Sequence, residues 1–307
     1  MTDELKNDDH LFNIDLYDIF KWLWKDKYVI TAFTLIFAAV SVIYALSIEN
    51  KFSSKVTVIS NIEDSKSIGG SLGGLGGIAS MAGLSLGGST MSPEVLKEIL
   101  MSNSFLGNFV VEKNIAPIIM AAQSYDPALE KFHFDEKIYD EKNRIWVRKH
   151  TYPQTLEPNT TELAVKVKEN LSANYDRKTK LISISYSSYS PYFSKSILTD
   201  LVNQFNLYIK NEERTKALKT IEYLKNELGG VGLVEVRVTM QTLLEEQYKK
   251  LALAETRDDY AFKVIEEPLV AYKKSEPKRA VICILITFIG LFLSIVVCLT
   301  YRILKRS

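Results

Sequence analysis

The chain has 307 residues, 47% of them hydrophobic, and its 38 Lys and Arg are balanced by 37 Asp and Glu. A formal net charge of +1 excludes the basic field with which proteins attract nucleic acid. The two cysteines, Cys283 and Cys298, lie in one apolar run, about 22 Å apart along a helix, so they cannot bridge each other. We therefore expect no disulfide in the rest of the chain.

Two uncharged apolar runs lie near the ends of the chain. Each is long enough to cross about 30 Å of hydrocarbon as a helix. A signal peptide is the alternative for the first run, because Ala45-Leu46-Ser47 resembles a cleavage site, but that run is too long and begins too far into the chain. The expected parts are a tail at 1–27, a membrane helix at 28–48, a block at 49–279, a second membrane helix at 280–301 and a tail at 302–307.

Two spans place both termini on the same side of the membrane. Lys and Arg flank the spans on both sides, so charge bias does not decide the orientation. Because the tails are too short to be domains, we place them in the cytoplasm and the block outside it. Residues 14–24 carry apolar residues at helical spacing and predict either an amphipathic helix on the membrane lipid or an extension of the first span.

Helix-capping residues and alternating apolar residues predict the helices and strands in the first half of the block. Ser92-Pro93-Glu94 is typical of a helix start, since Ser accepts a backbone hydrogen bond and Pro suits the first helical position. The expected elements are a strand at 52–59, helices at 92–101 and 105–113, and an irregular stretch at 114–159 with short helices near 127–131 and 140–149.

The second half of the block predicts long helices. After a helix at 161–170 and a strand hairpin at 171–186, Ser190-Pro191 opens a helix at 191–228. A second helix at 233–258 carries Leu244 and Leu251 at the spacing of a coiled-coil seam. The glycines between the helices favour a projecting helical hairpin, and one bent helix is the alternative. A strand at 260–268 completes an α+β fold with an α/β base.

Residues 69–88 contain nine of the chain's fourteen glycines. The stretch Gly74-Leu-Gly76-Gly-Ile-Ala79 fits a loose dinucleotide fingerprint, but the α/β pattern and acidic residue that such a site needs are missing. A flexible linker is one interpretation. The other is packing against the same segment of neighbouring subunits, because the uncharged segment carries Leu72, Leu75, Ile78 and Leu84.

The sequence contains no pattern typical of a catalytic site. Its three histidines are distant from one another, and for Glu130, His133 and Asp135 a solvated loop is a better interpretation than a metal site. Adjacent acidic pairs such as Glu245-Glu246 diverge on a helix, so they lack the convergence that acid–base catalysis needs. We therefore expect no catalytic residue, no metal and no cofactor.

Several stretches occur in a characteristic order. Phe12-Asn-Ile-Asp-Leu-Tyr-Asp-Ile-Phe20 precedes the first span, and the approach to the second contains Pro268, Ser275 and Pro277. Between them lie residues 95–106, 181–191, 221–225, 235–237 and 260–265. Together these stretches resemble the Wzz-type chain-length determinants, which are polysaccharide co-polymerases. The chain departs from the usual pattern of this family in two ways. It has few prolines before the second span, and it carries the segment 69–88, which occurs in only part of the family.

The resemblance implies the kinase-free type of co-polymerase, with no domain expected after the second span. It implies a non-catalytic ring of several subunits in the bacterial inner membrane, with the block in the periplasm. Such a scaffold sets the chain length of O-antigen or a related glycan, and its expected partners are a Wzy-type polymerase and lipid-linked glycan. An adaptor for capsule or exopolysaccharide export is the alternative, because it shares the two-span layout.

Overall fold

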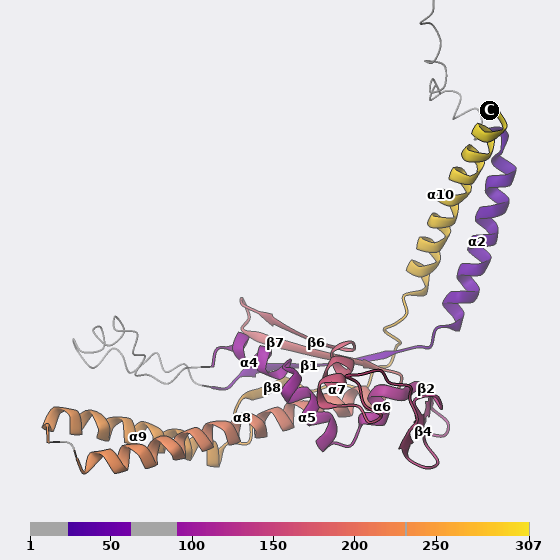
Figure 1. Cartoon of the computed structure of the whole chain (residues 1–307). Helices are drawn as coiled ribbons and strands as arrows, with labels where there is room; N and C mark the ends of the chain where they lie inside the picture. Colours follow the sequence, from indigo (N-terminus) through magenta and orange to yellow (C-terminus); the bar gives the residue numbers. More distant parts are fainter. Residues whose placement is uncertain (1–23, 63–90, 231, 307) are drawn as a thin grey trace, which may run out of the picture. The chain divides into compact units, whose positions relative to one another are not determined.

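The computed structural model describes residues 24–62, 91–230 and 232–306, and it divides into two compact units (Figure 1). Residues 1–50 and 275–307, from the two ends of the chain, form one unit. Residues 51–274 form the other. The predicted amphipathic segment before Trp24 and the glycine-rich segment 69–88, with Leu72, Leu75, Ile78 and Leu84, lie outside the described residues.

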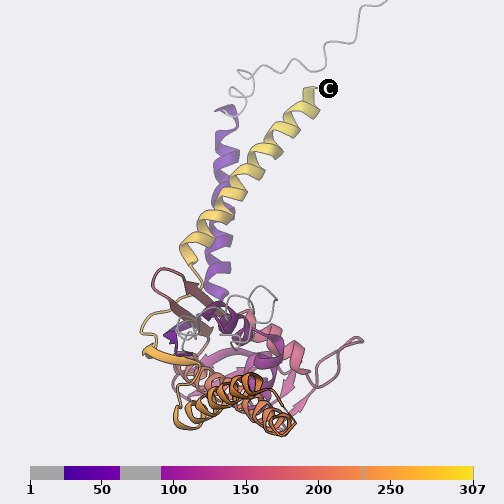
Figure 2. The same cartoon turned by 90° about the vertical axis from the view of Figure 1, so that its left-hand side faces the viewer.

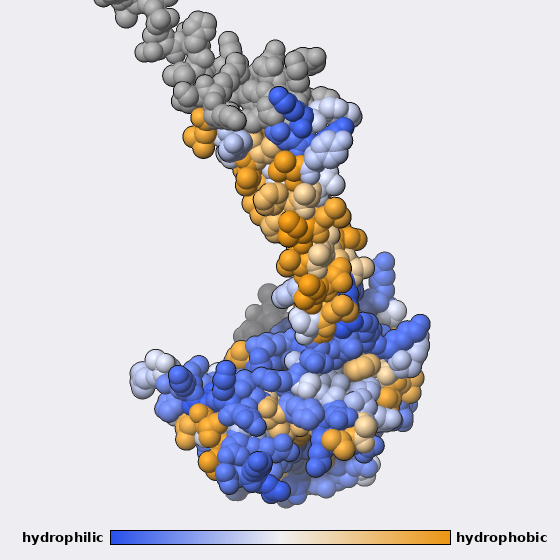
Figure 3. Space-filling view, turned by 90° about the vertical axis from the view of Figure 1, so that its right-hand side faces the viewer, coloured by the Kyte–Doolittle hydropathy of each residue, from blue (hydrophilic) through white to orange (hydrophobic). Residues whose placement is uncertain are grey.

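The terminal unit consists of two apolar helices. Helix α2 (Lys27–Ser47) and helix α10 (Arg279–Arg306) lie side by side in both cartoon views (Figures 1 and 2). Lys27–Ser47 and Arg279–Tyr301 are long and apolar enough to cross a membrane, with mean hydropathies of 2.4 and 3.1. Apolar residues cover much of the outer surface of this pair (Figure 3). The expected spans 28–48 and 280–301 match these helices to within one residue.

An antiparallel sheet organises the second unit. Its strands, in the order β6 (Leu171–Asp176), β7 (Leu181–Ser188), β1 (Phe52–Ser60) and β8 (Phe262–Glu266), are all antiparallel to their neighbours. In β7, Ile182 and Ile184 are buried, and Ser183 and Ser185, which alternate with them, are half-buried. This alternation gives the sheet one apolar face and one polar face. The predicted strands at 52–59 and 260–268 and the hairpin at 171–186 are confirmed.

Helices cover the apolar face of the sheet. They are α4 (Pro93–Leu100), α5 (Asn103–Glu112), α7 (Thr160–Lys168) and the first half of α8 (Pro191–Leu228), all with buried apolar residues in one core with β1 and β7. Ser92, Ser102, Asn159 and Ser190 cap these helices by accepting a backbone N–H, each contributing about 1 kcal/mol. The Ser-Pro signals therefore mark real helix starts.

The second half of α8 extends beyond the sheet and is accompanied by α9 (Val234–Thr256), which lies along it in both views (Figures 1 and 2). The 38 residues of α8 correspond to about 57 Å of helix. Arg214 Nε of α8 lies 2.6 Å from Glu255 Oε1 of α9, and Lys225 Nζ lies 5.5 Å from the ring centroid of Tyr248. The expected ranges 191–228 and 233–258 contain these two helices.

The stretch 114–159 differs from its prediction. After α6 (Ala116–Ala121), it forms two small antiparallel ribbons instead of helices near 127–131 and 140–149. Their strands are β2 (Ala122–Asp126) with β3 (Lys131–Phe134), and β4 (Tyr139–Asp140) with β5 (Ile145–Trp146). Asp126 and Asp140 accept backbone N–H groups two residues ahead, from Ala128 and Lys142, at 2.8 and 2.9 Å. These side chains favour tight turns over helix, which is why the helix predictions were wrong.

Candidate functional site

Helix α9 presents an apolar surface that the single chain only partly covers. Leu244 and Leu251, the predicted seam residues, are both half-buried, and Ala254 is the one fully buried residue of this helix. Val234 is 74% exposed and Val238 is 55% exposed. These two valines are four residues apart and so lie on the same face of the helix. Apolar residues gathered on one exposed face are typical of an interaction site. That Leu244 and Leu251 contact another subunit stays a prediction.

The predicted membrane-approach residues are shared between the two units. Pro268 is buried in the second unit, where Ser54 Oγ of β1 donates to the carbonyl of the next residue, Leu269, at 2.7 Å. Ser275 and Pro277 are half-buried residues of the terminal unit. The Ser54–Leu269 bond therefore continues the attachment of the chain to β1 beyond the end of β8, with the buried Pro268 beside it.

The two apolar helices contact each other closely at Gly290 of α10. A Cβ atom at this position would lie 2.4 Å from Cγ of Phe37 in α2, so only glycine permits this approach. Small residues at such crossings are typical of helix pairs in membranes. Near the start of α10, Arg279 Nη2 donates to Asn50 Oδ1 at 3.2 Å. The pair is therefore held by close packing and by a polar contact at one end.

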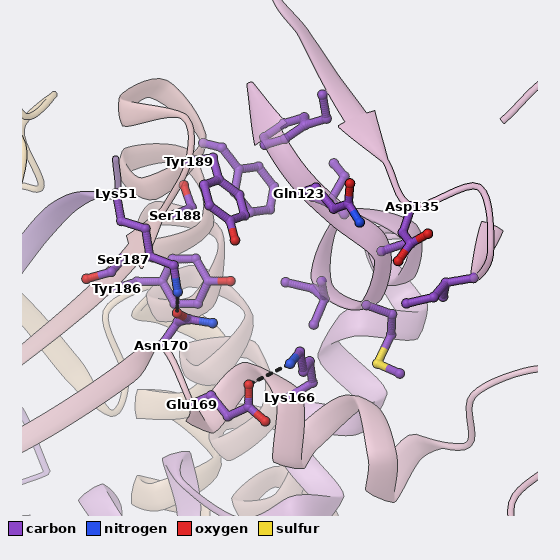
Figure 4. Close-up of a pocket in the computed structure, with 18 residues that line it drawn as sticks. Lys51, Gln123, Asp135, Lys166, Glu169, Asn170, Tyr186, Ser187, Ser188 and Tyr189 are labelled. Carbon is purple, nitrogen blue, oxygen red and sulfur yellow. Dashed lines mark hydrogen bonds and ion pairs between the residues drawn. The ribbon is translucent and has the colours of Figure 1, made fainter. Parts of the chain in front are cut away.

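A cavity of about 210 Å³ lies in the second unit, among α6, α7, β2 and the end of β7 (Figure 4). Its wall combines aromatic rings with amide and hydroxyl groups, and the lining includes Lys51, Gln123, Asn170, Tyr186, Tyr189 and Phe193. These residues come from five separate stretches of the chain. Because each stretch taken alone looks like ordinary strand, helix or turn, sequence reasoning missed this cavity.

Tyr186 is the most deeply buried polar side chain of the cavity wall. The residue is 4% exposed, and its ring packs edge-on against Phe193 with the ring centroids 6.3 Å apart. Burial raises the pKa of the Tyr186 hydroxyl well above its ordinary value. The hydroxyl points into the cavity and makes no hydrogen bond to any residue that the structure describes (Figure 4). A buried phenol usually has a partner, so this one is available to a ligand.

The charges of the side chains that line the cavity sum to zero. Lys166 Nζ lies 2.6 Å from Glu169 Oε2. Lys51 Nζ donates to Asn170 Oδ1 at 2.8 Å and lies 5.6 Å from the ring centroid of Tyr189. Asp135 contributes a further carboxylate to the wall. Two cations and two carboxylates thus leave no net charge to attract an ionic ligand.

The described residues offer no arrangement for metal binding. Nowhere in residues 24–62, 91–230 and 232–306 do three His, Cys, Asp or Glu side chains converge on one point. His133 is exposed on β3, two residues before the cavity-lining Asp135.

One protein-family model matches the first third of the chain. Residues 13–113 match the family model of Wzz, the chain length determinant proteins. The resemblance seen in the sequence is thereby confirmed. The Wzz match runs through α2 and β1 to the end of α5.

A solved structure of a full-length bacterial polysaccharide co-polymerase aligns with 95% of this chain and 99% of its own length. The two sequences are 12% identical, and the TM-score is 0.39. Among curated proteins, no sequence matches the chain.

Proposed function

We propose that this protein is a non-catalytic polysaccharide co-polymerase of the bacterial inner membrane that regulates the chain length of O-antigen or a related surface polysaccharide. The observation that carries the proposal is the Wzz match over residues 13–113. That match includes the first apolar helix, the central strand β1 and helices α4 and α5 of the core. It therefore relates both the anchor and the base to chain length determinants.

The proposed topology is two-pass, with both termini in the cytoplasm and residues 51–274 in the periplasm. Its support is the pair of apolar helices at the two ends of the chain, each long enough to span the hydrocarbon layer. An even number of spans leaves the whole second unit on one side. The absence of a disulfide between Cys283 and Cys298, the only cysteines, places no redox requirement on that unit.

We further propose a ring of several subunits in which α8 and α9 form a helical hairpin projecting from the α/β base. Support comes from the exposed apolar residues of α9, which a single chain leaves open to water. The glycine-rich segment 69–88 is proposed to pack against its copies near the membrane. Lipid-linked glycan and a Wzy-type polymerase are the proposed partners of this assembly.

Deleting the gene tests the function directly. The expected result is a broadened or shifted distribution of glycan lengths with polymerisation retained, measured by gel separation of the surface polysaccharide. Complete loss of polymer would point instead to an obligatory enzyme or transporter. Co-purification distinguishes length control from the alternative role in export. A polymerase partner supports length control, and an ABC exporter partner supports an export adaptor.

A further inference from the structure

We propose that the cavity lined by Tyr186, Gln123 and Asn170 binds one uncharged pyranose residue of a glycan. The inference rests on the proposed function for the source of the sugar, and it rests on the cavity alone for the chemistry of the ligand. We call this cavity the Tyr186 cavity.

The size of the Tyr186 cavity limits its ligand. Sites for drug-sized molecules typically measure about 300–1,000 Å³. At about 210 Å³ the Tyr186 cavity is smaller, so it admits a single ring and not a stretch of several sugars. A polymer would therefore be recognised through one residue at a time.

The cavity wall has partners for both the apolar faces and the polar rim of a sugar ring. A pyranose has apolar C–H faces, which pack on aromatic rings, and a rim of hydroxyl groups that both donate and accept hydrogen bonds. Rings of Tyr189 and Phe193 supply the apolar contact. The hydroxyl of Tyr186 and the amides of Gln123 and Asn170 supply donors and acceptors around the wall. In Figure 4 the Tyr186 hydroxyl points into the cavity, with Asn170 on its own side and Gln123 across from it.

The charge of the wall disfavours anionic ligands. A phosphate or carboxylate ligand is best held by several free cations, but Lys166 is paired with Glu169. That leaves Lys51 alone, and its ammonium is already held by Asn170 Oδ1 and the Tyr189 ring. Asp135 and Glu169 would repel an anion at the same site. An uncharged polyhydroxyl ligand meets no such penalty.

The unpartnered hydroxyl of Tyr186 makes a sharp test possible. Because it bonds no described residue, Tyr186→Phe removes an atom that a ligand needs and that the fold does not use. Gln123→Leu removes an exposed amide at nearly constant volume. Tyr175→Phe is the matched control, since Tyr175 is a half-buried tyrosine of the neighbouring strand β6 outside the cavity wall.

The experiment uses the full chain in a detergent without a sugar headgroup. Saturation-transfer NMR measures binding of methyl hexopyranosides, of methyl N-acetylhexosaminides and of polysaccharide released from the host's own surface. We expect saturable binding of at least one of these probes. Tyr186→Phe and Gln123→Leu should each weaken it about three- to tenfold, as loss of one neutral hydrogen bond does. Tyr175→Phe should leave both binding and melting temperature unchanged.

The outcomes separate this inference from the proposed function. Absence of binding to every probe, or equal weakening by Tyr175→Phe, overturns the inference even where gene deletion alters glycan length. Retained affinity in both cavity variants overturns it as well. If instead Tyr186-dependent binding is found but deletion leaves glycan length unchanged, the sugar site stands and the proposed function is wrong.

Discussion

Asn206 is a single polar residue that fastens the long helix to the edge of the sheet. It is buried in α8, where its Nδ2 donates to Phe262 O at 2.9 Å. Its Oδ1 accepts from Ala261 N at 2.9 Å and from Phe262 N at 2.7 Å. One amide thus satisfies three backbone groups just where β8 begins.

Asn206→Ala should lower the free energy of unfolding by about 2–4 kcal/mol. The reason is that the buried backbone groups of residues 261 and 262 lose their partners, and each unsatisfied group costs about 1–3 kcal/mol. Denaturant unfolding in mild detergent, followed by circular dichroism, measures the change. Asn203→Ala, one turn earlier on the exposed side of α8, is the control and should change stability by less than about 0.5 kcal/mol. Equal effects of the two variants would contradict the role of Asn206.

Tyr186 predicts a loss of stability at alkaline pH. Its pKa is raised above the ordinary value of 10.0 because the ring is buried. Above pH 10 the unfolded chain therefore loses this proton while the folded chain keeps it. The stability that depends on the neutral phenol is complete below pH 10 and falls as the pH rises further.

At pH 11, one pH unit above the pKa of the unfolded chain, Tyr186 should lower the free energy of unfolding by roughly 1.4 kcal/mol. Tyr186→Phe cannot ionise, so this variant should match the unchanged chain at pH 8 and exceed its stability at pH 11. The pKa of Tyr260 is also raised, mainly by burial and then by the charge of Glu213. Because both proteins keep Tyr260, its contribution cancels in the difference between their free energies of unfolding. A difference that does not depend on pH would refute the assignment.

At the scale of elements, α5 and α7 meet at a glycine that only a close approach explains. A Cβ atom on Gly107 of α5 would lie 2.2 Å from the carbonyl oxygen of Thr160, the first residue of α7. Glycine inside a helix is otherwise unfavourable by up to about 1 kcal/mol relative to alanine. The packing gained between the two helices offsets this cost.

Gly107→Ala should therefore destabilise the chain by about 1–3 kcal/mol, because backbone atoms must move apart. Gly229→Ala is the matched control: nothing lies within 4 Å of a Cβ atom there, and its φ of −70° suits alanine. That control should be neutral or stabilising by up to about 1 kcal/mol. Thermal unfolding of both variants in the same detergent decides the matter. A neutral Gly107→Ala would mean that the two helices separate at no cost.

At the scale of the whole molecule, the exposed apolar surface of α9 predicts assembly. Leu244→Asp and Leu251→Asp, made together, should reduce the number of subunits, because charges on half-buried seam positions oppose both the α8 contact and contact with a neighbour. Native mass spectrometry in mild detergent measures the assembly. Gln241→Asp adds one such charge at an exposed site of α9 and should leave the assembly intact. A monodisperse monomer of the unchanged chain would rule out the proposed ring.

The sequence by itself determined those features that depend on neighbours along the chain. Uncharged runs predict apolar helices, because about 20 residues suffice to cross hydrocarbon whatever surrounds them. Ser-Pro starts predict α4 and α8, because a cap satisfies backbone groups three residues away. Alternation of Ile and Ser predicts β7, because strands place successive side chains on opposite faces. The order of such stretches also sufficed for the Wzz resemblance.

Only the tertiary structure decided the features that join distant residues. The ribbons within 114–159 escaped prediction because Asx turns compete with helix over so short a stretch. The roles of Gly107 and Asn206 depend on carbonyl and amide groups more than 50 residues away. The Tyr186 cavity combines five stretches, none of which carries its signature alone. Packing brings such groups together through contacts that no local periodicity encodes, so the anchor and the helix starts are readable from the sequence and the cavity is not.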